Sequence, residues 1–275
     1  MWELLLRNKK FKISLGIIIS IVVFALIGAL VARNPTRRYG LPYQPPSSEF
    51  ILGTDKLGED MFARLCVGTR TSLMIGVFAG TISMLLAILF GGLGPYRGGR
   101  MDTFCNFSTN VMLVFPIIPL LVILSAWIEQ RSLLLVGLLI GVTGWPWAAR
   151  AMRAQILSLK EREFVNLARI SGMKARSVLI REIFPNLLAY MATVFVFAVG
   201  GSIMAEAAIS MIGVGPSDVV SLGNLLYWAL LNETFRLGYW WAYLPSGIIL
   251  TAFMVAAFTM HAGMDEVFNP RLRKM

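Results

Sequence analysis

Few residues of this chain are of the types that carry out covalent chemistry, and their spacing forms no catalytic set. The only histidine is His261, and the two cysteines, Cys66 and Cys105, have neither CxxC nor metal-ligand spacing. The sequence has no GxxxxGK[ST] phosphate-binding loop, no paired carboxylates in a pocket-like context and no Ser-His-Asp set. We therefore expect a chain without enzymatic activity, cofactor or metal site of its own, in which His261 packs between helices rather than binding a metal or sensing pH.

Three acidic residues lie in or beside apolar segments, where they could act on a transported solute. Glu206 directly follows an uncharged run of 23 residues, and an acid is costly in lipid. Its side chain could face a pathway, a partner chain or outer water. Asp218 and Glu233 belong to the segment 206–236 and could meet an incoming substrate or its carrier, or simply be solvated.

The densest group of charges is the segment 150–182, which holds eight Lys or Arg and three acids. Residues 150–170 contain no Gly or Pro and many good helix formers. Gly172 suits the left-handed position that ends a helix, and Pro185 suits the first turn of the next one. The pattern predicts a projecting helix, a Gly turn, a second helix and a return to the membrane. Its charges could meet an acidic protein partner or anionic lipid head groups, whereas nucleic acid is not expected.

Membrane-spanning helices must position these residues. The chain is 57% hydrophobic and 15% charged, with a mean hydropathy of +0.70. A helical span needs about 20 apolar residues. Six uncharged runs are near or above this length: 13–31, 71–94, 103–128, 132–149, 183–205 and 237–264. Six such runs leave too little soluble surface to enclose them, so we expect an all-α integral membrane protein with six transmembrane helices.

The distribution of basic residues predicts the orientation. Seventeen of the 25 Lys and Arg lie in four segments, and cytoplasmic loops accumulate these residues. The four segments are 1–12, 95–102, 150–182 and 265–275. Both termini are therefore expected in the cytoplasm. The first run follows a basic start, but it is longer than the apolar core of a signal peptide, so we expect a retained anchor.

The connecting segments suggest how the chain is divided. Residues 1–70 would form an anchor (13–31) and an outer loop with a short interfacial helix, which could equally be an extension of the second span. Residues 71–264 would form the core with five spans, and 265–275 a cytoplasmic tail. Pro116 and Pro119 should kink the third span, either lining a pathway or as a harmless bend.

Several motifs, in order along residues 50–275, resemble the dipeptide, oligopeptide and nickel group of binding-protein-dependent ABC permeases. Glu163, Ala168, Gly172 and Pro185 match the spacing of that family's EAA loop. Further matches are Leu52–Asp55, Leu57–Asp60, Gly98–Asp102, Ile212–Gly215 and Asn269–Arg271. Leu167 stands where the family has Ala, Glu59 where it has Arg, and Asn269 where it has Asp.

The resemblance implies a type I ABC importer permease fold in a prokaryotic plasma (inner) membrane. It implies a second homologous permease, two ATPase subunits that carry the ATP and Mg, and an extracytoplasmic substrate-binding protein, all in contact with membrane lipid. Peptides are the first expected substrate and nickel or a nickel chelate the next. The expected ATPase-coupling residues are Glu161, Glu163, Phe164, Ala168, Ser171, Gly172 and Pro185. Those expected to face the pathway or receptor are Pro116, Pro119, Glu206 and Asp218. A secondary transporter or a non-transporting scaffold is the alternative.

Overall fold

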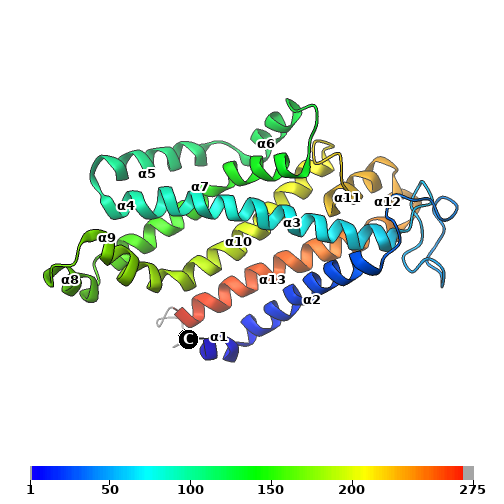
Figure 1. The fold of residues 1–275 in the computed structure, drawn as a ribbon. Coiled ribbons are helices and arrows are strands. Elements are labelled where there is room, and N and C mark those ends of the chain that lie inside the picture. Colours follow the sequence, from blue (N-terminus) through cyan, green and yellow to red (C-terminus); the bar gives the residue numbers. More distant parts are fainter. Residues whose placement is uncertain (1, 269–275) are drawn as a thin grey trace.

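The computed structural model describes residues 2–268, and within them the chain is helical with no strand (Figure 1). The elements are α1 (Trp2–Arg7), α2 (Lys9–Val31), α3 (Met61–Ala87), η1 (Ile88–Leu93), α4 (Gly94–Arg97), α5 (Gly99–Val114), α6 (Ile117–Ala126), α7 (Leu133–Lys160), α8 (Glu163–Ile170), α9 (Ala175–Val178), η2 (Leu179–Ile183), α10 (Phe184–Met211), α11 (Leu222–Leu231), α12 (Thr234–Leu237), η3 (Trp240–Ala242) and α13 (Leu244–Phe268).

Five helical stretches in the described residues are long and apolar enough to cross a membrane, and a bent pair supplies a sixth. The five are Lys9–Val31, Met61–Arg97, Leu133–Lys160, Tyr190–Met211 and Leu244–Met264. The bent pair joins α5 to α6 at an angle of 82°. The prediction of an all-α membrane protein is therefore confirmed, with five continuous spans and one broken span.

The break between α5 and α6 falls where the two prolines were expected to act. Pro116 has an extended backbone and precedes the first residue of α6. Pro119 lies in the first turn of α6, where a missing N–H costs no helical hydrogen bond. The kink is thus a sharp corner at Pro116, and both proline side chains are exposed.

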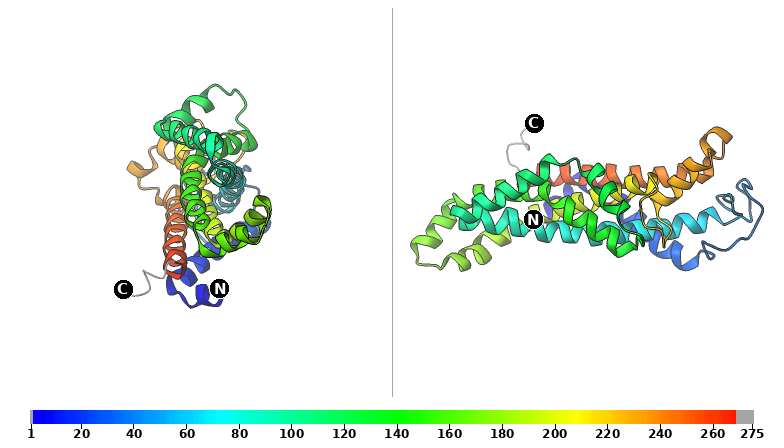
Figure 2. Two further views of the ribbon diagram at one scale, coloured as in Figure 1. Left: turned by 90° about the vertical axis from the view of Figure 1, so that its left-hand side faces the viewer. Right: turned by 90° about the horizontal axis from the view of Figure 1, so that it is seen from above.

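The bundle has two distinct ends (Figures 1 and 2). One end, here called the α8 end, carries α4, α8 and α9. The opposite end, here called the α11 end, carries the loop 32–60 with α11 and α12. The start of α2 meets the last turns of α13 away from the α11 end, where Asn8 and Lys10 bond to the Glu266 carboxylate.

The helix α3 begins directly after the α11-end loop. Asp60 caps it by accepting hydrogen bonds from the backbone N–H groups of Phe62 (2.9 Å) and Ala63 (3.4 Å). Residues 61–69 are the first turns of this one continuous helix. Of the two alternatives that the sequence left open, the structure has the extension of the second span, because the Asp60 cap starts a helix that nothing interrupts before the span.

Close helix packing builds the centre of the bundle, in which α3 packs against α7 and α10. Gly91, in the π-helical turn after α3, faces the backbone of Ala149 on α7. A Cβ at Gly91 would lie only 2.1 Å from the Ala149 carbonyl oxygen, so a side chain there would push the helices apart. Small residues allow such approach in membranes, where dispersion contacts replace the hydrophobic effect as the main driving force.

Candidate functional site

The α8 end is built around the predicted helix-turn-helix. The apolar span α7 continues without a break to Lys160, so its last turns leave the apolar region as a rigid helix. After a short corner at Glu161 and Arg162, α8 runs from Glu163 to Ile170. The chain turns at Gly172 and returns through α9 and η2 to α10, whose first turn contains Pro185. The predicted order of helix, Gly turn, helix and re-entry is confirmed.

Gly172 makes the turn that ends α8. Its φ is +79°, in the left-handed region that favours glycine. The Gly172 N–H donates to the Arg169 carbonyl (3.0 Å), and the Met173 N–H donates to the Ala168 carbonyl (3.1 Å). These two bonds form a Schellman motif, which satisfies carbonyls that a helix end otherwise leaves unpaired. A Cβ at Gly172 would meet no atom within 4 Å, so only the backbone conformation selects glycine here.

The short helix α8 has one buried and one exposed face. Val165 and Ala168 are buried against the apolar core formed by α7, α9 and η2. On the other face, 63% of Leu167 and 83% of Ile170 are exposed. Two adjacent exposed apolar side chains on a fixed helix at the end of the bundle form a small surface suited to a protein partner.

The predicted coupling residues do not share one face. Glu161, Glu163, Ser171, Gly172 and Pro185 are exposed, and Phe164 is half-buried. Ala168 is buried, so it supports α8 from beneath and does not belong to its outer surface. Ile170, which the motif match did not include, is the most exposed apolar residue of the loop. Helical spacing directs Ile170 away from Val165, and this spacing could have predicted its exposure.

Three contacts fix the loop to the rest of the α8 end. The Tyr96 hydroxyl donates to the Ala175 carbonyl (2.5 Å), and Lys160 Nζ donates to the Pro95 carbonyl (3.3 Å). The Arg153 guanidinium holds the Asp102 carboxylate with both nitrogens, at 2.7 and 3.1 Å. The turn 95–102 and the loop 150–182 thus form one braced unit, which can move as a body.

Glu206 has a different environment from any of the three that the sequence left open. It is fully buried within the chain and faces neither a pathway nor water. Its carboxylate accepts hydrogen bonds from the hydroxyls of Ser210 (2.7 Å), Ser221 (2.6 Å) and Ser72 (3.1 Å). These serines come from α10, from the residue that caps α11 and from α3. Glu206 therefore joins three elements, and no sequence pattern pointed to its serine partners.

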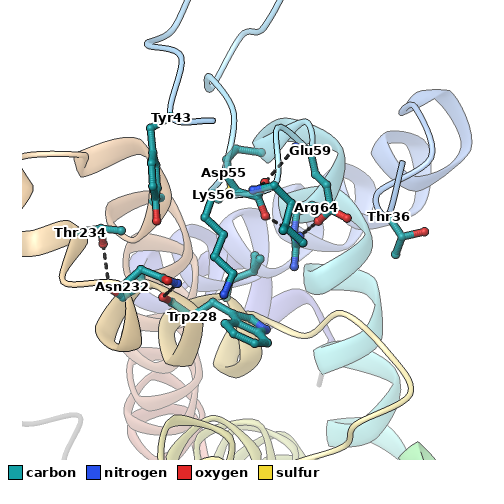
Figure 3. A pocket seen from close by; sticks show the side chains of 14 residues that line it. Thr36, Tyr43, Asp55, Lys56, Glu59, Arg64, Trp228, Asn232 and Thr234 are labelled. Carbon is teal, nitrogen blue, oxygen red and sulfur yellow. Dashed lines mark hydrogen bonds and ion pairs between the residues drawn. The ribbon is translucent and has the colours of Figure 1, made fainter. Parts of the chain in front are cut away.

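A pocket of about 370 Å³ opens at the α11 end (Figure 3). Arg64, which is nearly fully buried, holds Asp55 at 2.7 Å and also contacts the Glu59 carboxylate. Beside this ion cluster the Lys56 ammonium lies 3.9 Å from the ring centroid of Trp228. Glu59, which departs from the family pattern, thus has a partner in Arg64, and sequence inspection did not identify this pair.

A second pocket of about 330 Å³ adjoins the first, and Thr36 and Trp228 line both. It contains Asp218, which the sequence selected, and Arg131, which it did not. Pro116 and Pro119 do not line it and lie at the α5–α6 corner instead. The residues expected to face the pathway are therefore dispersed over three places.

The remaining chemically capable residues form no further site in the described part of the chain. The ring of His261 packs edge-on against Phe197, with centroids 5.7 Å apart, as a helix-packing histidine would. Cys66 and Cys105 are buried free thiols. Among residues 2–268, no group of three or more His, Cys, Asp or Glu is placed to hold a metal ion.

Comparison with known proteins identifies the family of this chain. Residues 83–274 match the model of the binding-protein-dependent transport system inner membrane component. The chain is 30% identical to the dipeptide transport system permease protein DppC of Bacillus subtilis, over 99% of this chain and 85% of that protein. It is also 30% identical to the oligopeptide permease OppC of Bacillus subtilis (97% and 87% covered) and 29% identical to OppC of Mycobacterium tuberculosis (98% and 93% covered). With its several apolar spans, this chain is a multi-pass inner-membrane protein that belongs to the family of binding-protein-dependent ABC transport permeases.

Proposed function

We propose that this chain is one of two related permease subunits of an ATP-driven importer of short peptides. It forms half of the translocation pathway and catalyses no reaction itself. Two partner ATPase subunits carry the ATP and Mg, and an extracytoplasmic receptor delivers the substrate. The names of the relatives, dipeptide and oligopeptide permeases, support peptides as the substrate.

The observation that carries this proposal is the rigid loop at the α8 end. A short helix transmits a displacement to the spans only if it is firmly attached to them. α8 meets this condition because the Gly172 turn and the Tyr96, Lys160 and Arg153 contacts fix it to α7, α9 and the turn 95–102. ATP binding that brings the ATPases together would then move α8 and shift the permease between two arrangements.

The orientation follows from the same end of the molecule. The turn 95–102 and the loop 150–182 lie together there, and both are rich in Lys and Arg, as cytoplasmic segments are. The first described helix, α1, and the last turns of α13 lie away from the α11 end, which suits a chain with both termini in the cytoplasm. The α11 end then faces the receptor. The division into an anchor with its outer loop (1–70), a core (71–264) and a tail (265–275) is part of this proposal.

A pull-down with the assembled transporter tests the ATPase contact. Leu167→Asp and Ile170→Asp place charges on exposed positions, so the permease should still fold. We expect each to lower recovery of the ATPase subunits with the permease by roughly tenfold or more, as loss of a central interface residue does. ATP-dependent peptide uptake into proteoliposomes should fall in parallel.

Leu231→Asp is the matched control, since this leucine is similarly exposed (56%) but lies at the α11 end. It should leave ATPase recovery unchanged. Normal ATPase recovery and uptake in the double variant Leu167→Asp/Ile170→Asp would refute the docking role of α8. Uptake without any associated ATPase would favour a secondary transporter instead.

A further inference from the structure

The second pocket at the α11 end has fixed walls. The α10 helix ends at Met211, Gly213 follows it with a φ of +89°, and the Val214 N–H donates back to the Ile209 carbonyl (3.0 Å). The following loop is tied to the segment between α6 and α7 by a bond from the Ser217 N–H to the Arg131 carbonyl (3.0 Å). Ser210, which lines the pocket, is held by Glu206. The pocket is therefore preformed by segments that lie far apart in the chain.

Two side chains of opposite charge line this pocket without meeting each other. Within the described residues, the Arg131 and Asp218 side chains make no ion pair or hydrogen bond, with each other or with any other group. The Arg131 Nε atom is buried and has no hydrogen-bond partner there. A buried donor without a partner is costly, because it has lost water and gained nothing in exchange. The unpartnered buried atom therefore lies on the Arg131 side of the pocket, whereas Asp218 is exposed.

A ligand that pairs with both side chains carries a negative and a positive group at different points. A carboxylate suits Arg131, because the guanidinium presents parallel N–H donors that match two carboxylate oxygens. An ammonium group suits the Asp218 carboxylate. The volume, about 330 Å³, is at the lower end of the ~300–1,000 Å³ of small-ligand sites, so the ligand is small.

We propose that this pocket is a binding site for a short zwitterionic peptide at the outer opening of the permease. Arg131 binds the C-terminal carboxylate, and Asp218 binds the N-terminal ammonium group. Asn224 and Tyr227 also line the pocket. Recognition of both termini would accept different side chains while selecting for free ends and short length. This inference rests on the proposed peptide import and adds a selective step within the permease itself.

Peptides with blocked termini test the two charges separately. The assembled transporter without its receptor is reconstituted in nanodiscs and titrated with trialanine, N-acetyl-trialanine and trialanine amide. The wild type should bind trialanine roughly tenfold more tightly than either blocked form, since each blocked form loses one charged hydrogen-bonding group. Arg131→Gln should bind trialanine and its amide equally, and Asp218→Asn should bind trialanine and its N-acetyl form equally.

Arg236→Gln is the control, since Arg236 is exposed, pairs with Glu233 and does not line the pocket. It should keep the preferences of the wild type. The proposal is overturned if the wild type binds no trialanine or treats the three peptides alike, or if both variants weaken all three equally. If Arg131→Gln leaves trialanine binding unchanged and weakens only the association of the receptor with the transporter, the occupant is a receptor side chain. That result also overturns the proposal.

Receptor-dependent uptake by the wild type distinguishes failure of this inference from failure of the proposed function. If the wild-type transporter imports trialanine but shows no terminal preference in nanodiscs, only the pocket assignment fails. If it imports no peptide, the proposed substrate class fails as well.

Discussion

The hydroxyl of Ser221 lies 2.6 Å from the Glu206 carboxylate and also accepts the Asn224 N–H as the cap of α11. Ser72 does the same on the other side, donating to Glu206 and accepting the Leu222 N–H. Because both serine oxygens accept backbone hydrogens of the first turn of α11, their own protons point to the carboxylate. Glu206 thus holds the start of α11 through two serines.

Glu206→Gln should destabilise the permease. A glutamine offers one acceptor oxygen where the carboxylate offers two, so at least one of the three serine hydroxyls loses its acceptor. We expect the free energy of unfolding to fall by about 1–3 kcal/mol, the cost of an unsatisfied buried polar group. Thermal unfolding of the detergent-solubilised protein measures this. Thr81→Val is the control, since the exposed Thr81 hydroxyl bonds only to its own helix, and an unchanged unfolding temperature in Glu206→Gln would contradict the prediction.

Gly172→Val should impair coupling through the backbone alone. The left-handed conformation costs a residue with a Cβ roughly 1–2 kcal/mol, and most for a β-branched one, although no atom blocks the side chain. Gly172→Asn should behave nearly as the wild type, because Asn tolerates this conformation. ATP-dependent uptake per ATP hydrolysed, measured for both variants, checks this. Equal losses in the two variants would mean that size, and not φ, limits position 172.

Arg64→Met should be among the most destabilising single changes at the α11 end. It leaves the carboxylates of Asp55 and Glu59 close together without their shared cation, and removal of one partner from a buried ion pair costs about 3–5 kcal/mol. The triple variant Asp55→Asn/Glu59→Gln/Arg64→Met should recover much of that loss. Protein yield in the membrane and thermal unfolding measure both, and a triple variant no more stable than Arg64→Met would disprove this account.

The contact between the first and last helices should weaken in acid. Hydrogen bonds from Lys10 and then Asn8 lower the pKa of Glu266 from its ordinary 4.5. A lowered pKa means that the contact stabilises the protein fully above pH 4.5 and is lost as the pH falls through the lower folded-state value. The protection of the residues 2–12 amides, as the exchange rate relative to the intrinsic rate at each pH, should therefore fall below pH 4.5. In Glu266→Gln this protection should already be low at pH 7 and should not fall further below pH 4.5.

Local patterns made much of the architecture predictable. The uncharged runs located the spans, because a bilayer of fixed thickness demands about 20 apolar residues per helix. Gly172 and Pro116 also acted as expected, since the left-handed turn and the missing proline N–H depend on the backbone of those residues themselves. The match of the ordered motifs to the permease family is likewise a property of the sequence.

The partners of the charged residues were decided only by the tertiary structure. Glu206 lies 134 positions from its hydrogen-bond partner Ser72 in the chain. Arg131 and Asp218 come from different loops but line one pocket, and no local spacing indicates either relationship. The same holds for α8, where packing against α7, α9 and η2 buries Ala168 and leaves Ile170 outside. Sequence determines which residues prefer lipid, helix or turn, whereas the folding of distant segments against each other determines which charges are paired and which remain available to a ligand.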